Sequence, residues 1–215
     1  VGTFLVSKKI NRLIKEEANT DPQLMVLINP FDSLLRPSPL SRKPANGNNG
    51  IAVAGALSNT GTGTITLTGT GGGSGVSANN HGVVVTASAI SGTGSGAITI
   101  TGDGGNTGGS GGTNHGVYSA IANGIGTSGT RAITITGTKG GQASSYGFIT
   151  DVAQGVRNTG ASGNITIASD TISLNLANNI VSVANILIGP RTAVTMGVGT
   201  GAGTLSFTDA MVAMS

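Results

Sequence analysis

Both histidines of the chain, His81 and His115, lie in an Asn-His-Gly motif, and Tyr146 occupies the matching place before a third glycine. If the segments that carry them stack as repeats, the rings lie about 4.8 Å apart, the spacing of neighbouring strands. Two imidazoles at that spacing could share a metal ion, but metal sites usually need three or four ligands and no Asp, Glu or Cys shares their position. The pattern favours ring stacking at a turn and predicts no metal and no cofactor. The asparagines beside this column predict a hydrogen-bonded ladder of Asn48, Asn80 and Asn114.

Carboxylates are the next candidates for chemistry, because paired carboxylates hydrolyse glycosidic bonds. Asp103 and Asp170 each lie five residues after the first isoleucine of an Ile-Thr-Ile segment. Stacking would place them in one column, two coils and about 9.6 Å apart. That separation exceeds the roughly 5–5.5 Å of a retaining pair and lies at the upper limit of the inverting range. No aromatic residue flanks them for stacking on a sugar. The sequence therefore predicts solvated turn residues, no catalytic residue and no enzyme.

Threonines alternate with apolar residues in the same segments and would form two ranks on one outer face. The first rank is Thr66, Thr99, Thr134 and Thr166, and the second is Thr68, Thr101 and Thr136, ending at Ala168. Such ranks resemble the surface of ice-binding solenoids, and their hydroxyls could also bind a glycan. Threonine is, however, the polar β-branched residue that exposed strands favour. The Thr ranks are therefore an alternative binding surface rather than the leading prediction.

Two motifs recur in phase and reveal an internal repeat that would position all these residues. A turn followed by an apolar strand opens each unit, and the residues aligned with Gly50 are Gly82, Gly116, Gly147 and Asn179. A second, Ile-Thr-Ile-Thr-like motif follows at residues 64–68, 97–101, 132–136, 164–168 and, after a longer gap, 204–208. The unit is about 32 residues long.

Alternation within the second motif predicts strands with one buried face, because Ile65 and Leu67 point to one side and the threonines to the other. A unit with two or three short strands cannot bury that face alone, whereas stacked units pair each strand with its equivalent one coil further along. We therefore predict an all-β fold, a parallel β-solenoid of about five coils over residues 46–215. Gly-rich segments such as 69–73 and 102–105 are expected to form turns at positive φ.

Composition excludes several classes. The 215 residues include 38 Gly, 3% aromatic and 9% charged residues and no Cys, so there is no disulfide scaffold and no thiolate metal site. No apolar run approaches the roughly 18 residues of a membrane-spanning helix. Six Pro without glycine at every third position exclude collagen. The body after residue 45 has four basic and four acidic residues, so it offers no electrostatic footprint for nucleic acid.

Residues 1–45 form a distinct head, with five of the six Pro, one Gly, and seven basic against four acidic residues. Helical spacing predicts a short amphipathic helix there, and its residues are Val6, Ile10, Leu13, Ile14, Lys8, Lys9 and Arg12. After the helix, the sequence predicts a Pro-rich extended segment. We expect this head to cap the first coil, since open solenoid ends template aggregation. Docking on a partner protein is the alternative, and association with an anionic membrane is less favoured.

The Ile-Thr-Ile-Thr-Gly strands and residues 186–210 resemble the β-strand repeats of filamentous-haemagglutinin-like proteins, the giant bacterial adhesins. The resemblance covers about residues 48–215, while the head does not match the secretion domain of that family. It implies a right-handed β-helix, export to the cell surface, and adhesion or scaffolding rather than catalysis. The chain opens on Val1 without a signal-peptide pattern, which indicates a processed or partial piece.

We therefore predict a non-enzymatic, extracellular structural or adhesive segment of a large bacterial surface or secreted protein. Its expected partner is a cell-surface protein or a glycan. Two alternatives stay open: an accessory subunit that docks into a larger assembly through residues 1–45, and a module that binds ice or glycan through the Thr ranks.

Overall fold

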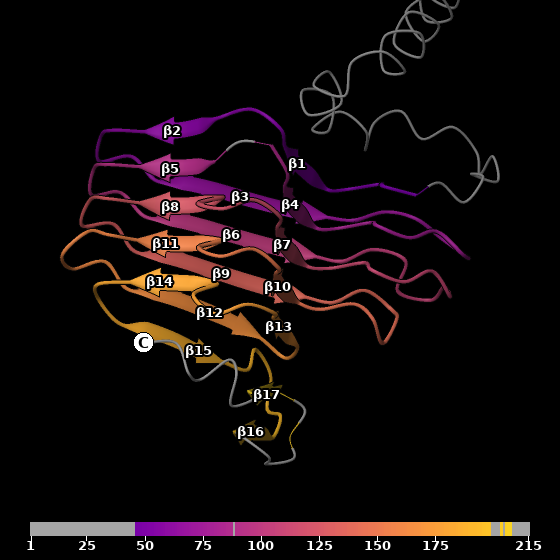
Figure 1. The fold of residues 1–215 in the computed structure, drawn as a ribbon. Helices are drawn as coiled ribbons and strands as arrows, with labels where there is room; N and C mark the ends of the chain where they lie inside the picture. The colour runs from indigo at the N-terminus through magenta and orange to yellow at the C-terminus, as the bar shows by residue number, and fades with distance from the viewer. Residues whose placement is uncertain (1–45, 88, 199–202, 204, 208–215) are drawn as a thin grey trace, which may run out of the picture. The chain divides into compact units, whose positions relative to one another are not determined.

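The computed structural model describes residues 46–87, 89–198, 203 and 205–207 (Figure 1). The predicted head, residues 1–45 with its helix and docking residues, lies outside the described residues. Within the described part every regular element is a β-strand. None of these residues forms a helix long and apolar enough to cross a membrane.

Three parallel sheets of five strands each form the body of the molecule, so the predicted all-β parallel β-solenoid is confirmed (Figure 1). The first sheet contains β1 (Ile51–Val53), β4 (Val83–Val85), β7 (Val117–Ser119), β10 (Phe148–Thr150) and β13 (Ile172–Leu174). The second contains β2 (Leu57–Asn59), β5 (Ile90–Gly92), β8 (Ile125–Thr127), β11 (Val156–Asn158) and β14 (Ile180–Ser182). The third contains β3 (Ile65–Thr70), β6 (Ile98–Asp103), β9 (Ile133–Thr138), β12 (Ile165–Ser169) and β15 (Ile186–Gly189). Each coil contributes one strand to each sheet.

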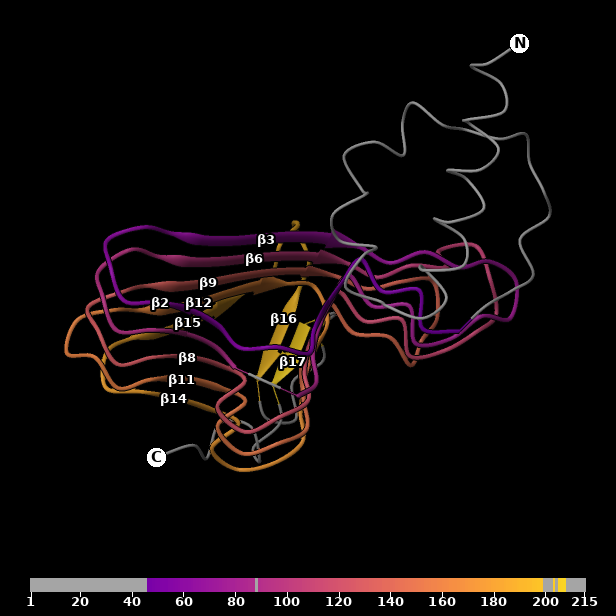
Figure 2. The same cartoon turned by 90° about the horizontal axis from the view of Figure 1, so that it is seen from above.

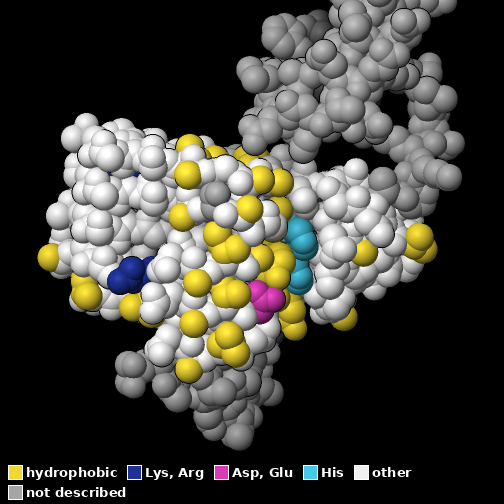
Figure 3. All heavy atoms as spheres, turned by 45° about the horizontal axis from the view of Figure 1, so that its top comes forward, with side chains coloured by type: hydrophobic (Ala, Val, Ile, Leu, Met, Phe, Trp, Pro, Cys, Tyr) yellow, Lys and Arg dark blue, Asp and Glu magenta, His cyan; other side chains and the backbone are white. Residues whose placement is uncertain are grey.

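A side lobe projects from the body between the third and first sheets (Figure 2). It consists of residues 71–82, 104–116 and 139–147, the segments that join each long strand to the next coil. Its interior is polar, and its buried side chains include Ser77, Asn80, Asn106, Asn114 and Ser145. Buried polar groups are stable only when hydrogen-bonded, so the lobe depends on hydrogen bonds as the body depends on apolar packing. In Figure 3 the surface of the lobe is mostly white, with a few hydrophobic side chains.

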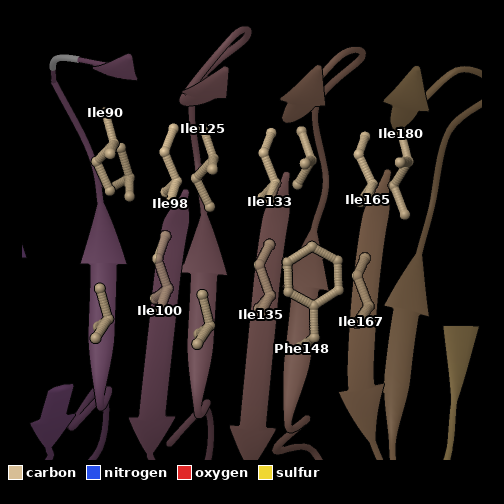
Figure 4. Packing of buried hydrophobic residues seen from close by; sticks show 14 of the residues in the cluster. Ile90, Ile98, Ile100, Ile125, Ile133, Ile135, Phe148, Ile165, Ile167 and Ile180 are labelled. Carbon is tan, nitrogen blue, oxygen red and sulfur yellow. The ribbon is translucent and has the colours of Figure 1, made fainter. Parts of the chain in front are cut away.

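The core of the body consists of stacked aliphatic side chains (Figure 4). In the third sheet Ile98, Ile133 and Ile165 pair directly from coil to coil, and all three are fully buried. Phe148 is the one aromatic residue of the described core cluster. Burying each aliphatic side chain stabilises the fold by about 1.5–3 kcal/mol, which explains why so narrow a coil is rich in Ile and Val.

The last coil differs from the prediction because it lacks the side-lobe excursion. Hydrogen bonds join equivalent residues 32, 34 and 31 positions apart in the earlier coils, but 24 apart between Gly147 and Thr171. The fifth unit therefore opens at Ile172. The predicted opening at Asn178–Ile180 is wrong. Ile180 instead begins β14 in the second sheet.

The strand predicted at residues 204–208 is present, but its expected place as the last strand of the third sheet is wrong, since β15 completes that sheet by pairing with β12. Leu205–Phe207 forms β17, which pairs only with β16 (Met196–Val198) in a separate two-stranded parallel sheet. Leu205 is fully buried and belongs to the core cluster. This small sheet therefore covers apolar interior at the end of the last coil.

The Gly-rich turns expected at positive φ are confirmed only in part. Gly73 has a positive φ, whereas Gly69 and Gly102 lie in strands β3 and β6 and allow backbones to approach closely. Among the described residues only Gly47, Gly73 and Gly75 are glycines with positive φ. At the neck between body and lobe, a Cβ atom on Gly102 would overlap the carbonyl oxygen of Gly116, and the pair Gly137 and Gly147 repeats this relation one coil on. The other described residues with positive φ are not glycines: they are Asn79, Asn106, Asn123 and Asn178, together with Thr113 and Gln154.

Candidate functional site

An aromatic cluster lies at the neck of the side lobe, where the chain re-enters the first sheet. The rings of His81 and His115 are parallel to within 3°, with centroids 5.0 Å apart. Tyr146 continues the stack at 5.8 Å from His115. The predicted ring column is therefore present, at the spacing of one coil. Tyr118 was missed, and it meets both imidazoles edge-on at 5.4 and 5.5 Å. Its position in the middle of β7 points it outward, which was the signal in the sequence.

Each imidazole accepts a hydrogen bond from the backbone of the following coil. The N–H of His115 donates to Nδ1 of His81 over 3.1 Å, and the N–H of Tyr146 donates to Nδ1 of His115 over 3.0 Å. Asn49 holds the same place in the first coil, since its Oδ1 accepts from the N–H of His81 over 2.9 Å. A ring nitrogen that accepts is unprotonated, so both histidines carry their proton on Nε2.

This arrangement does not suit a metal ion. The Nδ1 lone pairs are already used along the stack, and Nε2 carries the proton in both rings. Among the described residues no group of three or more His, Cys, Asp and Glu side chains could hold a metal. The chemistry available to the cluster is therefore hydrogen bonding and ring contact.

Asp151 supplies the one charge in contact with the cluster among the described residues. The Tyr118 hydroxyl donates to its Oδ2 over 2.9 Å. Burial, followed by this hydrogen bond, raises the pKa of Tyr118 to about 12. Burial lowers the pKa of both histidines to about 4; the neighbouring ring adds to this at His81, whereas the charge of Asp151 opposes it at His115. At neutral pH the cluster thus presents two neutral imidazoles beside one carboxylate.

The predicted asparagine ladder runs through the interior of the lobe. Oδ1 of Asn80 accepts from the backbone and side-chain nitrogens of Asn48, and Oδ1 of Asn114 accepts the equivalent pair from Asn80. Ser145 continues the ladder, because its hydroxyl accepts from the N–H of Asn114 over 3.0 Å. The ladder links the coils of the lobe, and we assign it a structural role.

The Thr ranks lie on the outer face of the third sheet. Register pairing places Thr66, Thr99, Thr134 and Thr166 in one rank and Thr68, Thr101 and Thr136 in the next. Both ranks end at the last coils, where Ala168 follows Thr136 and Leu187 follows Thr166. A third rank, of Thr70, Asp103 and Thr138, was missed because those residues follow a glycine rather than an isoleucine.

Of the two carboxylates predicted as turn residues, Asp103 is instead the last residue of strand β6, paired with Thr70 and Thr138, so the prediction is wrong for it. Asp170 lies directly after β12, as predicted. Asp170 follows Ser169, the last paired residue of β12, and its Oδ1 accepts from the N–H groups of Arg191 and Thr192 over 2.9 and 2.8 Å. Desolvation is the largest single influence and raises the pKa of Asp170, but these bonds, one from the Thr192 hydroxyl and the charge of Arg191 together outweigh it and lower the pKa. Asp170 therefore anchors the turn after β15.

Arg131 is a fully buried charge that the sequence did not reveal. One terminal nitrogen donates to the carbonyl oxygens of Asn59 and Gly61 over 3.2 and 3.1 Å. Its Nε and second terminal nitrogen have no partner within the described part of the chain. Because Gly92 of the preceding coil lies directly against this side chain, we assign it to packing between coils.

The fold and these sites define the class as a parallel β-solenoid with a polar side lobe. Comparisons with protein-family models, with curated proteins and with solved structures find no match to the chain. The likeness to filamentous-haemagglutinin-like proteins therefore stays a prediction from sequence.

Proposed function

We propose that this chain is a non-enzymatic structural and adhesive segment of a bacterial surface or secreted protein, acting outside the cell. The observation that supports the proposal best is the in-register face of the third sheet, where Thr66, Thr99 and Thr134 stand side by side from coil to coil. The hydrophobic columns beneath hold this face rigid.

A regular hydroxyl face suits adhesion for physical reasons. Each hydroxyl both donates and accepts hydrogen bonds, and the β-branched side chain has few rotamers to lose on binding. Rank members repeat at the strand spacing of about 4.8 Å, so the face offers many weak contacts to an extended, hydroxylated polymer. Changes on this outer face leave the inward columns untouched, which lets the same scaffold serve different surfaces.

The test is binding of the intact chain to a printed array of neutral and acidic glycans. We expect binding that falls at least tenfold in the double variant Thr99→Lys with Thr134→Lys, because two cations interrupt the first rank in adjacent coils. The matched control is Ser58→Lys with Ser91→Lys, on the paired outward positions of β2 and β5. Equal loss in both variants, or no glycan bound at all, would refute the adhesive part of the proposal.

A further inference from the structure

The aromatic cluster presents hydrogen-bonding groups that the fold does not use. No described group accepts from Nε2 of His81 or His115, yet neither atom is among the fully buried polar atoms that lack a partner. Both Nε2 atoms therefore keep some contact with solvent, although His81 and His115 are only 6% and 5% exposed. Figure 3 shows the two histidines next to each other at the surface, with an acidic side chain and hydrophobic groups beside them.

The donors are paired and fixed. The two rings are parallel and 5.0 Å apart, and each is held by a hydrogen bond at Nδ1 and by the edge of Tyr118. A ligand thus meets two preorganised donors at no cost in side-chain entropy. Asp151 is exposed and accepts from Tyr118 only through Oδ2, so among the described residues its Oδ1 is available as an acceptor.

The ligand that fits these groups carries hydroxyls and no charge. An anion would approach two neutral imidazoles next to the carboxylate of Asp151, which repels it. A metal cation finds no free lone pair on the rings. A sugar, by contrast, has oxygens that accept from the Nε2–H groups, hydroxyls that donate to Asp151, and C–H faces that pack against Tyr118 and Tyr146.

We propose that His81, His115, Tyr118 and Asp151 form a binding site for a neutral sugar residue. This inference deepens the proposed adhesive function and rests on it, since it names a second surface through which the solenoid holds a glycan. The site lies at the neck of the side lobe, and the Thr ranks lie on the third sheet.

The structure supplies a variant that removes the donors and keeps the fold. Asn49 occupies the equivalent place in the first coil and accepts the next backbone N–H through Oδ1. His81→Asn and His115→Asn should therefore preserve the ladder of backbone hydrogen bonds while deleting both Nε2–H groups. Tyr118→Phe serves as a third variant, because it removes only the hydroxyl that orients Asp151.

The experiment is an NMR titration of the intact chain at pH 7 with the methyl glycosides of galactose, mannose and N-acetylglucosamine. Glucuronic acid is the charged comparison. We expect at least one neutral glycoside to shift the imidazole resonances of the native chain and the backbone amide resonances of Tyr118 and Asp151 at millimolar concentration. The double His→Asn variant has no histidine left, so its binding is followed through those amide resonances. It should bind about tenfold more weakly or worse while its circular dichroism is unchanged. The proposal is overturned if no neutral glycoside moves these resonances, if the double variant binds as well as the native chain, or if only the acid binds.

The two proposals fail in different ways. Array binding that is lost in the Thr99→Lys and Thr134→Lys variant but kept in the double His→Asn variant would leave the adhesive function standing and remove this site. A glycan array without any binding, together with unmoved imidazole resonances, would remove both.

Discussion

Arg131 of the third coil occupies the space that a side chain at Gly92 of the second coil would fill. A Cβ atom built on Gly92 would lie 2.5 Å from both Nε and Cζ of Arg131. The arginine side chain passes this glycine and reaches the carbonyl oxygens of Asn59 and Gly61 in the first coil. Because Gly92 has no side chain, the long side chain of Arg131 can pass through the second coil.

The first prediction concerns the dependence of Arg131 and Gly92 on each other. In the first coil Asn59 braces its own turn, accepting from the N–H of Gly61 over 2.7 Å and donating to the carbonyl of Gly63 over 2.8 Å. Gly92→Asn alone should destabilise the fold by about 1–3 kcal/mol, because the new side chain collides with Arg131. Gly96 lies four residues after Gly92, as Gly63 lies four residues after Asn59, so the introduced amide could brace its own turn once Arg131→Gly removes the colliding side chain. The double variant should therefore recover most of the loss.

Urea unfolding of both single variants and the double variant measures this coupling. A double variant whose loss equals the sum of the two single losses would show that Arg131 and Gly92 do not depend on each other.

The second prediction concerns the neck between body and lobe. Gly102→Ala should lower the free energy of unfolding by about 3 kcal/mol or more, since the methyl group meets the rigid carbonyl of Gly116. Gly126→Ala is the matched control in another strand, where the nearest atom to the new Cβ would be 3.5 Å away. Thermal unfolding followed by circular dichroism compares the two. Similar melting temperatures would mean that the neck can open to admit a side chain.

The third prediction tests the polar ladder of the lobe. Asn114→Ala removes the acceptor for two nitrogens of Asn80 and the donor to the carbonyl of Gly111, all in a buried setting. We expect a loss of about 2–4 kcal/mol, because each unsatisfied buried group costs about 1–3 kcal/mol. Asn114→Ser should cost less, since Ser145 already shows that a hydroxyl can accept at this place. Denaturant midpoints of the two variants measure this difference. Equal losses of stability in Asn114→Ala and Asn114→Ser would contradict a hydrogen-bonding role for Asn114.

The fourth prediction is a fall in stability between about pH 6.5 and pH 4. The pKa of His81 and of His115 is about 4 in the fold against 6.5 for an unperturbed histidine. Between these pH values the unfolded chain therefore binds more protons than the folded chain. The contribution of the two neutral histidines to the free energy of unfolding is complete above pH 6.5, decreases as the pH falls, and is lost below about pH 4. Melting temperatures at pH 7.5, 5.5 and 4 should therefore decrease by several degrees.

The double His→Asn variant is the control for this pH dependence, because it keeps the ladder but cannot titrate. Its melting temperature should change much less across the same window. Asp170 does not affect this comparison. Because its pKa is lowered in the fold, its contribution to stability is lost only at pH values below the ordinary pKa of an aspartate. An equally steep pH dependence in the variant would assign the effect to other groups.

Strand positions and their stacking were predictable wherever the repeat is regular. The alternation of Ile65, Thr66 and Leu67 and its recurrence at Ile98 and Ile133 express a period that holds for any strand with one buried face. The stack of His81 on His115 followed directly, because residues at the same place in successive units must lie one coil apart.

The prediction from sequence was wrong where the repeating unit changes length. Nothing local in residues 170–180 distinguishes a coil without a lobe from one with it, because Asn178 and Asn179 imitate the motif that opens the earlier units. The choice follows from which apolar residues can reach the core, and Ile172 and Leu174 bury their side chains in the first sheet. Residues 205–207 were misplaced for the same reason, since their strand packs on the end of the core as part of a separate sheet.

The sequence by itself determined the repeat, the strands, the aliphatic columns and the order of side chains along each column, because these depend only on local alternation and on a near-constant period. Only the tertiary structure decided which residues from different columns meet. Tyr118 faces His81 and His115, Asp151 joins Tyr118, and Arg131 fills the space above Gly92. These contacts depend on how the sheets turn against one another and on the space left between coils, and neither quantity is encoded in the period of a repeat.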